Sequence, residues 1–122
     1  MGSFRVACQV ANHLRRTRTV DVPSLLVDTG SECTWIPEHM LRSIGIKPEK
    51  KDVPFMMANG TTVTRSIGFA ILRIGDAFTT DEVVFAQEGD LCLLGSRTLE
   101  GMNLRVDPRA KKLVAAGPVP AA

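Results

Sequence analysis

The sequence has little of several residue types, and each shortage excludes something. It has no tyrosine, one tryptophan and three cysteines in 122 residues. The cysteines (Cys8, Cys33 and Cys92) form no Cys-x-x-Cys pair, so we expect no structural zinc site or redox motif, and each thiol should be buried. His13 and His39 show no ligand spacing with each other or with nearby carboxylates, so we expect no bound metal.

Long apolar runs and an excess of one charge are also missing. No run approaches the ~20 apolar residues that span a membrane, so we expect no membrane partner. Fifteen basic residues against thirteen acidic ones give a net charge of +2, which predicts no nucleic-acid partner. The one dense basic run, Arg15, Arg16 and Arg18, is interpreted as a solvated loop. Residues 1–10 lack the apolar segment of a signal peptide, so a cytoplasmic location is the default expectation.

What is present is typical of one small globular domain rich in strands. Alternating apolar residues predict a strand from Phe4 to Val10, and others follow along the chain. Pro23 argues against a central ladder position at that point of the second strand. The remaining predicted strands cover residues 20–27, 34–36, 53–57, 61–74, 78–85 and 91–94, with a final hairpin over 104–114; short helices are predicted at 37–43 and 97–102.

These elements predict an all-β fold, a small closed barrel or sandwich with one or two short helices. We expect one domain over residues 1–114 and a flexible tail over 115–122, which is rich in alanine and proline. The Asn59-Gly60 pair lies between two β-prone runs and predicts a hairpin, because both residue types tolerate positive φ.

The most informative stretch is the one from Asp28 to Ser31. It places an acid directly after the apolar run Leu25-Leu26-Val27, although aspartate is a poor strand residue and costly to bury. Gly30 permits backbone geometry and close approach that other residues resist. An ordinary turn is the simple interpretation, since Asp, Thr, Gly and Ser are all turn residues. The alternative is a carboxylate presented for chemistry at the end of a strand.

Three features in this order resemble the aspartic proteases of the retropepsin type. They are the apolar-Asp-Thr-Gly-Ser motif at Asp28, a hairpin at residues 55–66 where that family carries its flap, and Leu93-Leu94-Gly95 before a short helix. The segments 34–37 and 68–75 are similar to soluble bacterial members, and the resemblance covers residues 20–114. It implies a small closed β-barrel-like retropepsin (acid protease) fold.

The resemblance also implies roles for individual residues. Asp28 would be the catalytic acid and base, and Thr29 and Gly30 would support it. Water would be the nucleophile, so no cofactor is expected. Residues 56–63 would form the flap tip, which closes over an extended peptide or protein substrate. The residues expected to bind that substrate are Trp35, Met57, Ala58, Asn59, Gly60 and Leu93. A core position for Trp35 or Leu93, and a plain surface hairpin for residues 56–63, are the competing interpretations.

Aspartic proteolysis requires two facing carboxylates, and the chain has one Asp-Thr-Gly. The resemblance therefore implies a symmetric homodimer with one Asp28 from each subunit. The leading hypothesis is an aspartic endopeptidase. A binding or dimerisation module with the same fold is the runner-up, and a regulatory domain of a larger protein is the third hypothesis.

The sequence also departs from the viral pattern. Glu32 stands where the viral enzymes carry aspartate, and Ser96 separates Gly95 from Arg97, so a Glu32–Arg97 ion pair is a further expectation. Gly60 is the one glycine near the predicted flap tip. The C-terminal segment differs too, so we expect the dimer to use a surface other than the viral termini.

Overall fold

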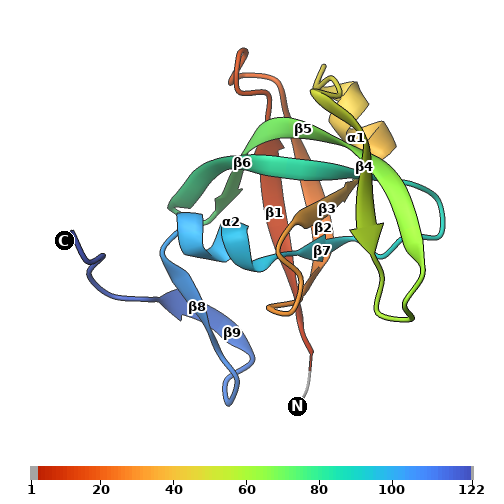
Figure 1. Ribbon diagram of the computed structural model, residues 1–122. Helices are drawn as coiled ribbons and strands as arrows, with labels where there is room; N and C mark the ends of the chain where they lie inside the picture. Colours follow the sequence, from red (N-terminus) through yellow and green to blue (C-terminus); the bar gives the residue numbers. More distant parts are fainter. Residues whose placement is uncertain (1–2, 122) are drawn as a thin grey trace.

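The computed structural model describes residues 3–121, which contain nine strands and two short helices (Figure 1). The elements are β1 (Arg5–Ala11), β2 (Thr19–Val27), β3 (Thr34–Pro37), α1 (Glu38–Ser43), β4 (Lys50–Met56), β5 (Thr62–Ile74), β6 (Ala77–Ala86), β7 (Leu93–Leu94), α2 (Ser96–Gly101), β8 (Leu104–Asp107) and β9 (Lys112–Ala115). The predicted strands and helices are all present, although β7 is shorter than the expected 91–94.

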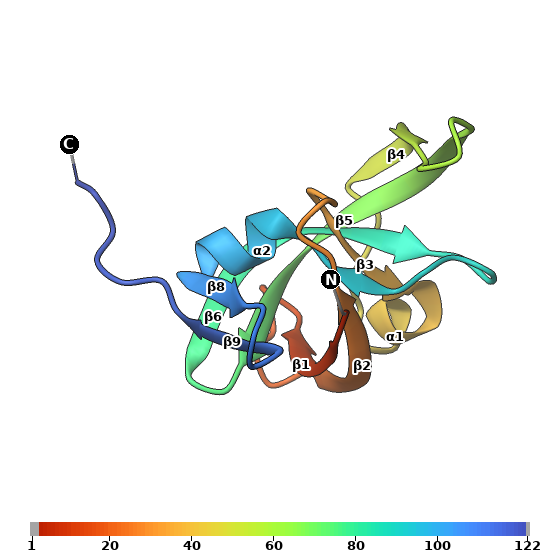
Figure 2. The ribbon, with the colours of Figure 1, turned by 90° about the horizontal axis from the view of Figure 1, so that it is seen from below.

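Seven strands form one sheet in the order β1-β2-β7-β3-β6-β5-β4. β1 also pairs with β5, through Gln9↔Arg73 and its neighbours, so six of the strands close into a ring. β4 pairs with β5 alone within the described sheet, and the β4–β5 hairpin projects from the ring (Figure 2). The fold is therefore all-β with two short helices.

The two faces of the sheet bury two separate apolar clusters. β6 shows how, because successive side chains of a strand point to opposite faces. Val83 and Phe85 enter the main core inside the ring, whereas Val84 and Ala86 enter the second cluster, which also holds Trp35. This double burial explains why the end of β6 is apolar at every position rather than at alternate ones.

Pro23 lies at an irregularity of the ladder, as the sequence indicated. The register between β1 and β2 shifts from Val6↔Leu25 to Cys8↔Val22, so two residues of β2 oppose one of β1. Pro23 is exposed there. A bulge tolerates proline because its missing N–H removes no ladder hydrogen bond.

The C-terminal hairpin β8–β9 is a separate two-stranded sheet beside α2 (Figure 2). Leu104, Val106 and Leu113 pack against the main core. The first residues of the predicted tail are also bonded: Ala116 N–H donates to the Asn103 carbonyl at 2.9 Å, and the Asn103 amide donates to the Gly117 carbonyl at 2.7 Å. A flexible tail beyond these bonds stays a prediction.

The expectation of three buried thiols is correct for one cysteine and wrong for two. Cys8 is buried, and burial raises the pKa of its thiol to about 11. Cys33 and Cys92 are half-buried at the edge of the second cluster. Each is next to a strand end at the surface, a position that residue type alone does not reveal.

A nearly buried ion pair joins the β4–β5 hairpin to the turn between β6 and β7. Arg65 Nε and Nη2 donate to the two carboxylate oxygens of Asp90 at 2.7 and 2.8 Å. The side chains are 14% and 11% exposed. The hydrogen bonds from Arg65 hold the pKa of Asp90 below its ordinary value near 3.8. The ionised pair therefore stabilises the fold above that pH, and the contribution is lost as the pH falls.

We predict that Asp90→Asn lowers the free energy of unfolding by about 3 kcal/mol at pH 7, because the nearly buried charge of Arg65 loses the opposite charge that balances it. The difference from the wild type should shrink as the pH falls below about 4. Urea denaturation at pH 7 and pH 3 measures both. Asp21→Asn on the exposed part of β2 is the matched control. Equal losses at the two pH values would contradict the assignment.

Candidate active site

Asp28 follows directly after β2, and the neighbouring strand fixes its backbone. β2 runs parallel to β7, with Leu26↔Leu93 and Val27↔Leu94 as partners. The next hydrogen bond in this series runs from the Asp28 N–H to the Leu94 carbonyl at 3.0 Å. The acid is thus held where the ladder ends, half-buried at the edge of the ring.

The loop that follows Asp28 is folded around its carboxylate. The Gly30 N–H donates to Asp28 Oδ1 at 3.0 Å, and the Ser31 N–H donates to the Asp28 carbonyl at 3.2 Å. A Cβ on Gly30 would lie 3.2 Å from Asp28 Oδ1, tighter than an ordinary contact. Thr29 and Gly30 themselves are exposed. The sequence motif is therefore a turn, and the Gly30 N–H in it fixes the orientation of the Asp28 carboxylate.

The loop also rests on the segment after β7. Ser96 N–H donates to the Ser31 carbonyl at 2.7 Å, and Arg97 N–H donates to the Glu32 carbonyl at 3.1 Å. Gly95 makes this contact possible, because a Cβ there would overlap the Cys33 carbonyl oxygen and lie 2.7 Å from that of Glu32. Two motifs more than sixty residues apart in sequence are thereby packed together.

Ion pairs between charged side chains extend the contact between the two segments to the surface. The expected ion pair is present, with Arg97 Nη2 3.0 Å from Glu32 Oε2. Arg97 Nη1 also lies 3.5 Å from Glu82 Oε1, and Glu82 Oε2 lies 2.6 Å from Lys50 Nζ at the start of β4. Because Arg97 and Glu32 are well exposed, their pair contributes no more than about 1 kcal/mol to stability. The pair therefore adds little to the stability of the fold.

The hairpin expected to cover a substrate is present. The turn joins β4 to β5: the Met57 N–H donates to the Thr61 carbonyl at 2.8 Å, and the Gly60 N–H donates to the Met57 carbonyl at 2.9 Å. Gly60 has a φ of +86°, whereas Asn59 has no positive φ and instead accepts hydrogen bonds from Thr61. Ala58, Asn59 and Gly60 are exposed. The turn and the loop after β2 point to the same end of the molecule (Figure 1).

Trp35 and Leu93 lie together beneath this hairpin. They are partners across β3 and β7, and they are 6% and 8% exposed. The ring of Phe55 from β4 meets Trp35 edge-to-face, with centroids 5.1 Å apart. Met57 packs against the same cluster. Within the chain Trp35 and Leu93 are therefore core residues. They form an apolar surface, the apolar floor, next to the Asp28 loop.

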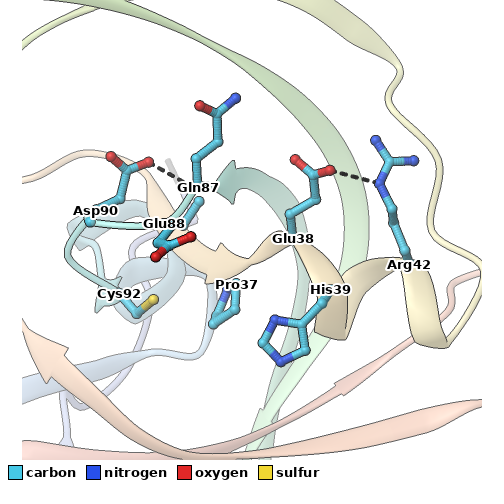
Figure 3. A pocket seen from close by; sticks show the side chains of 10 residues that line it. Pro37, Glu38, His39, Arg42, Gln87, Glu88, Asp90 and Cys92 are labelled. Atoms are coloured by element: carbon cyan, nitrogen blue, oxygen red, sulfur yellow. Dashed lines mark hydrogen bonds and ion pairs between the residues drawn. The ribbon is translucent and has the colours of Figure 1, made fainter.

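A well-formed pocket lies away from Asp28. It has a volume of about 700 Å³ and lies between α1 and the turn after β6 (Figure 3). Its charged groups are in part already paired: Glu38 with Arg42 at 2.9 Å, and Asp90 with Arg65. Asp28 does not line this pocket. Asp28 instead lies half-buried at the edge of the ring, and Thr29 and Gly30 beside it are exposed.

Other kinds of site are not found in the described part of the chain. Within residues 3–121, no group of three or more histidine, cysteine, aspartate or glutamate side chains is arranged to hold a metal ion. None of the helices in that range has the length and apolar character needed to cross a membrane.

Comparison with protein families agrees with this geometry. Residues 19–101 match the family described as gag-polyprotein putative aspartyl protease, a range that includes both the Asp28 loop and the Leu94-Gly95 segment. The chain belongs to this aspartyl protease family, and its fold is the all-β retropepsin-like fold that the sequence predicted. No match was found among curated proteins.

The sequence analysis missed three polar residues behind the site. Thr34 and Thr98 are fully buried, and Asp81 is half-buried beside them. They are bonded to one another and to Gly95. A threonine in a strand and a threonine in a short helix carry no local signal of such a contact, which depends on the packing of α2 against β3 and β6.

We predict that Gly95→Ala lowers the free energy of unfolding by about 2 kcal/mol or more, because the added methyl group overlaps backbone atoms that cannot rotate away. Urea denaturation measures the change. Ser96→Ala is the control, because it changes the next residue without adding an atom. An unchanged midpoint in Gly95→Ala would show that the two segments are not in this contact.

Proposed function

We propose that the protein is an aspartic endopeptidase that acts as a symmetric homodimer. The observation that carries the proposal is the Asp28 loop, in which a half-buried carboxylate at a strand end is fixed by backbone bonds beside the exposed Thr29 and Gly30. The family supports aspartyl protease chemistry in general. Since each chain supplies one such acid, a two-fold axis beside Asp28 would complete the pair.

The chemistry follows from two carboxylates at close range. They cannot both be ionised, so the pair shares one proton. The ionised carboxylate removes a proton from a water molecule, and the water oxygen attacks the peptide carbonyl carbon. The protonated carboxyl donates to the carbonyl oxygen as charge develops there. Transfer of a proton to the amide nitrogen then breaks the C–N bond and restores the pair.

The substrate would bind in an extended conformation between the hairpin turn and the apolar floor. Met57, Ala58, Asn59 and Gly60 would cover it from one side, where Ala58 to Gly60 are exposed. Trp35 and Leu93 would contribute pocket walls from the floor, through the small fraction of each that is exposed. An apolar floor favours hydrophobic side chains next to the cleaved bond.

We predict that the wild type cleaves a diverse peptide mixture between mildly acidic and neutral pH and that Asp28→Asn does not. Mass spectrometry of the products measures the cuts and their flanking residues. Asp21→Asn is the matched control, because it removes an exposed carboxylate from the same strand. Equal cleavage by the wild type and Asp28→Asn would place the activity elsewhere.

A mixing experiment tests the dimer. Adding excess Asp28→Asn to a fixed amount of wild type should lower activity, because mixed dimers hold one carboxylate instead of two. Excess Asp21→Asn should not lower it. If excess Asp28→Asn leaves the activity unchanged and the measured mass is that of a monomer, the shared site is excluded. A folded dimer that cleaves nothing would favour the runner-up, a binding or dimerisation module with this fold.

A further inference from the structure

A chain of hydrogen bonds runs through the interior behind the Asp28 loop. The Gly95 N–H donates to Thr34 Oγ1 at 2.9 Å. Thr34 Oγ1 and Thr98 Oγ1 are 2.6 Å apart, and Thr98 Oγ1 donates to Asp81 Oδ2 at 2.9 Å. Both hydroxyl groups belong to fully buried residues. Four residues from β3, β6, α2 and the segment after β7 are joined in this way.

The direction of this chain follows from its two ends. A backbone N–H can only donate, and each hydroxyl has a single hydrogen. Since the hydrogen of Thr98 goes to Asp81, the Thr98 oxygen accepts the hydrogen of Thr34. Every bond therefore points from Gly95 toward the Asp81 carboxylate. Bonds aligned in this way in a low-dielectric interior strengthen one another, and loss of one member leaves a buried donor unpaired.

The near end of the chain lies against the proposed catalytic residue. Gly95 follows Leu94, whose carbonyl accepts the Asp28 N–H. Gly95 also lies against the backbone of Glu32 and Cys33, which belong to the same loop. A shift of Gly95 would consequently move both the ladder bond to Asp28 and the contact beneath its loop.

We propose that Asp81, acting through Thr98 and Thr34, is a positioning residue for Asp28. In this role its carboxylate contacts neither the substrate nor the reacting atoms. It fixes the position of Gly95 and thereby the orientation of the Asp28 carboxyl group. The proposal rests on the proposed proteolysis for its kinetic consequence. Its structural consequence, the protection of two backbone amides, does not depend on activity.

The kinetic test uses variants that keep or remove one hydrogen bond. We expect Thr34→Val to lower kcat by about 10- to 100-fold with KM nearly unchanged, because a small misplacement of Asp28 affects the reaction more than substrate contacts. Thr34→Ser, which keeps the hydroxyl group, should retain most of the activity. At the far end, Asp81→Ala should behave like Thr34→Val, whereas Asp81→Asn should retain activity because its amide oxygen still accepts from Thr98.

Val10→Ala is the control for stability alone. It creates a cavity in the main core at the end of the β1–β2 pairing opposite to Asp28. We expect it to lower the urea midpoint and leave kcat unchanged. If Val10→Ala lowers kcat as much as Thr34→Val at an equal loss of stability, the role of Thr34 is structural only and the proposal is overturned.

Amide hydrogen exchange by NMR separates this proposal from the proposed function. In Thr34→Val and Asp81→Ala, the amides of Gly95 and Asp28 should exchange at least tenfold faster than in the wild type, while the amide of Leu72, in the β5–β6 ladder, should not change. If the wild type cleaves no peptide but the two amides respond, the proteolysis fails and the positioning chain stands. Unchanged exchange at both amides in Asp81→Ala would overturn the chain.

Discussion

The close approach of Gly95 to the backbone carbonyls of Glu32 and Cys33 is the constraint on which the site depends. It is possible because one residue lacks a side chain, and it brings two backbone N–H groups within reach of the loop after β2. Such contacts between main chains are insensitive to rotamer changes. In the proposed dimer a carboxylate that faces a second carboxylate would need this kind of support, since a small error of position would separate the pair.

The strand order explains how this contact arises. β7 is two residues long and lies between β2 and β3, parallel to the first and antiparallel to the second. The chain leaves β2, passes through the Asp28 loop and returns on β3, so the loop must cross the end of β7. The ring is closed by β1 and β5 on the other side. The ring is thus closed within one chain and holds the Asp28 carboxylate at its edge, and the proposed dimer would supply the second carboxylate.

Much of this could be predicted from the sequence, for identifiable reasons. The alternation in β1, the Asn59-Gly60 turn and the acid after an apolar run are local patterns, and each element was found where the pattern placed it. The Glu32–Arg97 pair could be expected because the two residues flank the two motifs on which the resemblance to retropepsins is based. Residues whose neighbours come from other elements could not be assigned. Leu91 was expected in a strand and is exposed, two cysteines lie at the surface edge, and Thr34 bonds to a helix sixty-four residues away.

The two consecutive acids of β6 show how one strand can serve the loop and the hairpin differently. Adjacent strand residues point to opposite faces, so Asp81 reaches the buried hydroxyl of Thr98, while Glu82 reaches Arg97 and Lys50. The first contact is an interior hydrogen bond, and its loss leaves a donor unpaired at a cost of about 1–3 kcal/mol. The second involves an exposed arginine and a lysine on β4, where solvent weakens the attraction. The contact of Asp81 thus supports the Asp28 loop from the interior, whereas Glu82 joins α2 to the start of β4 through surface charges that solvent weakens.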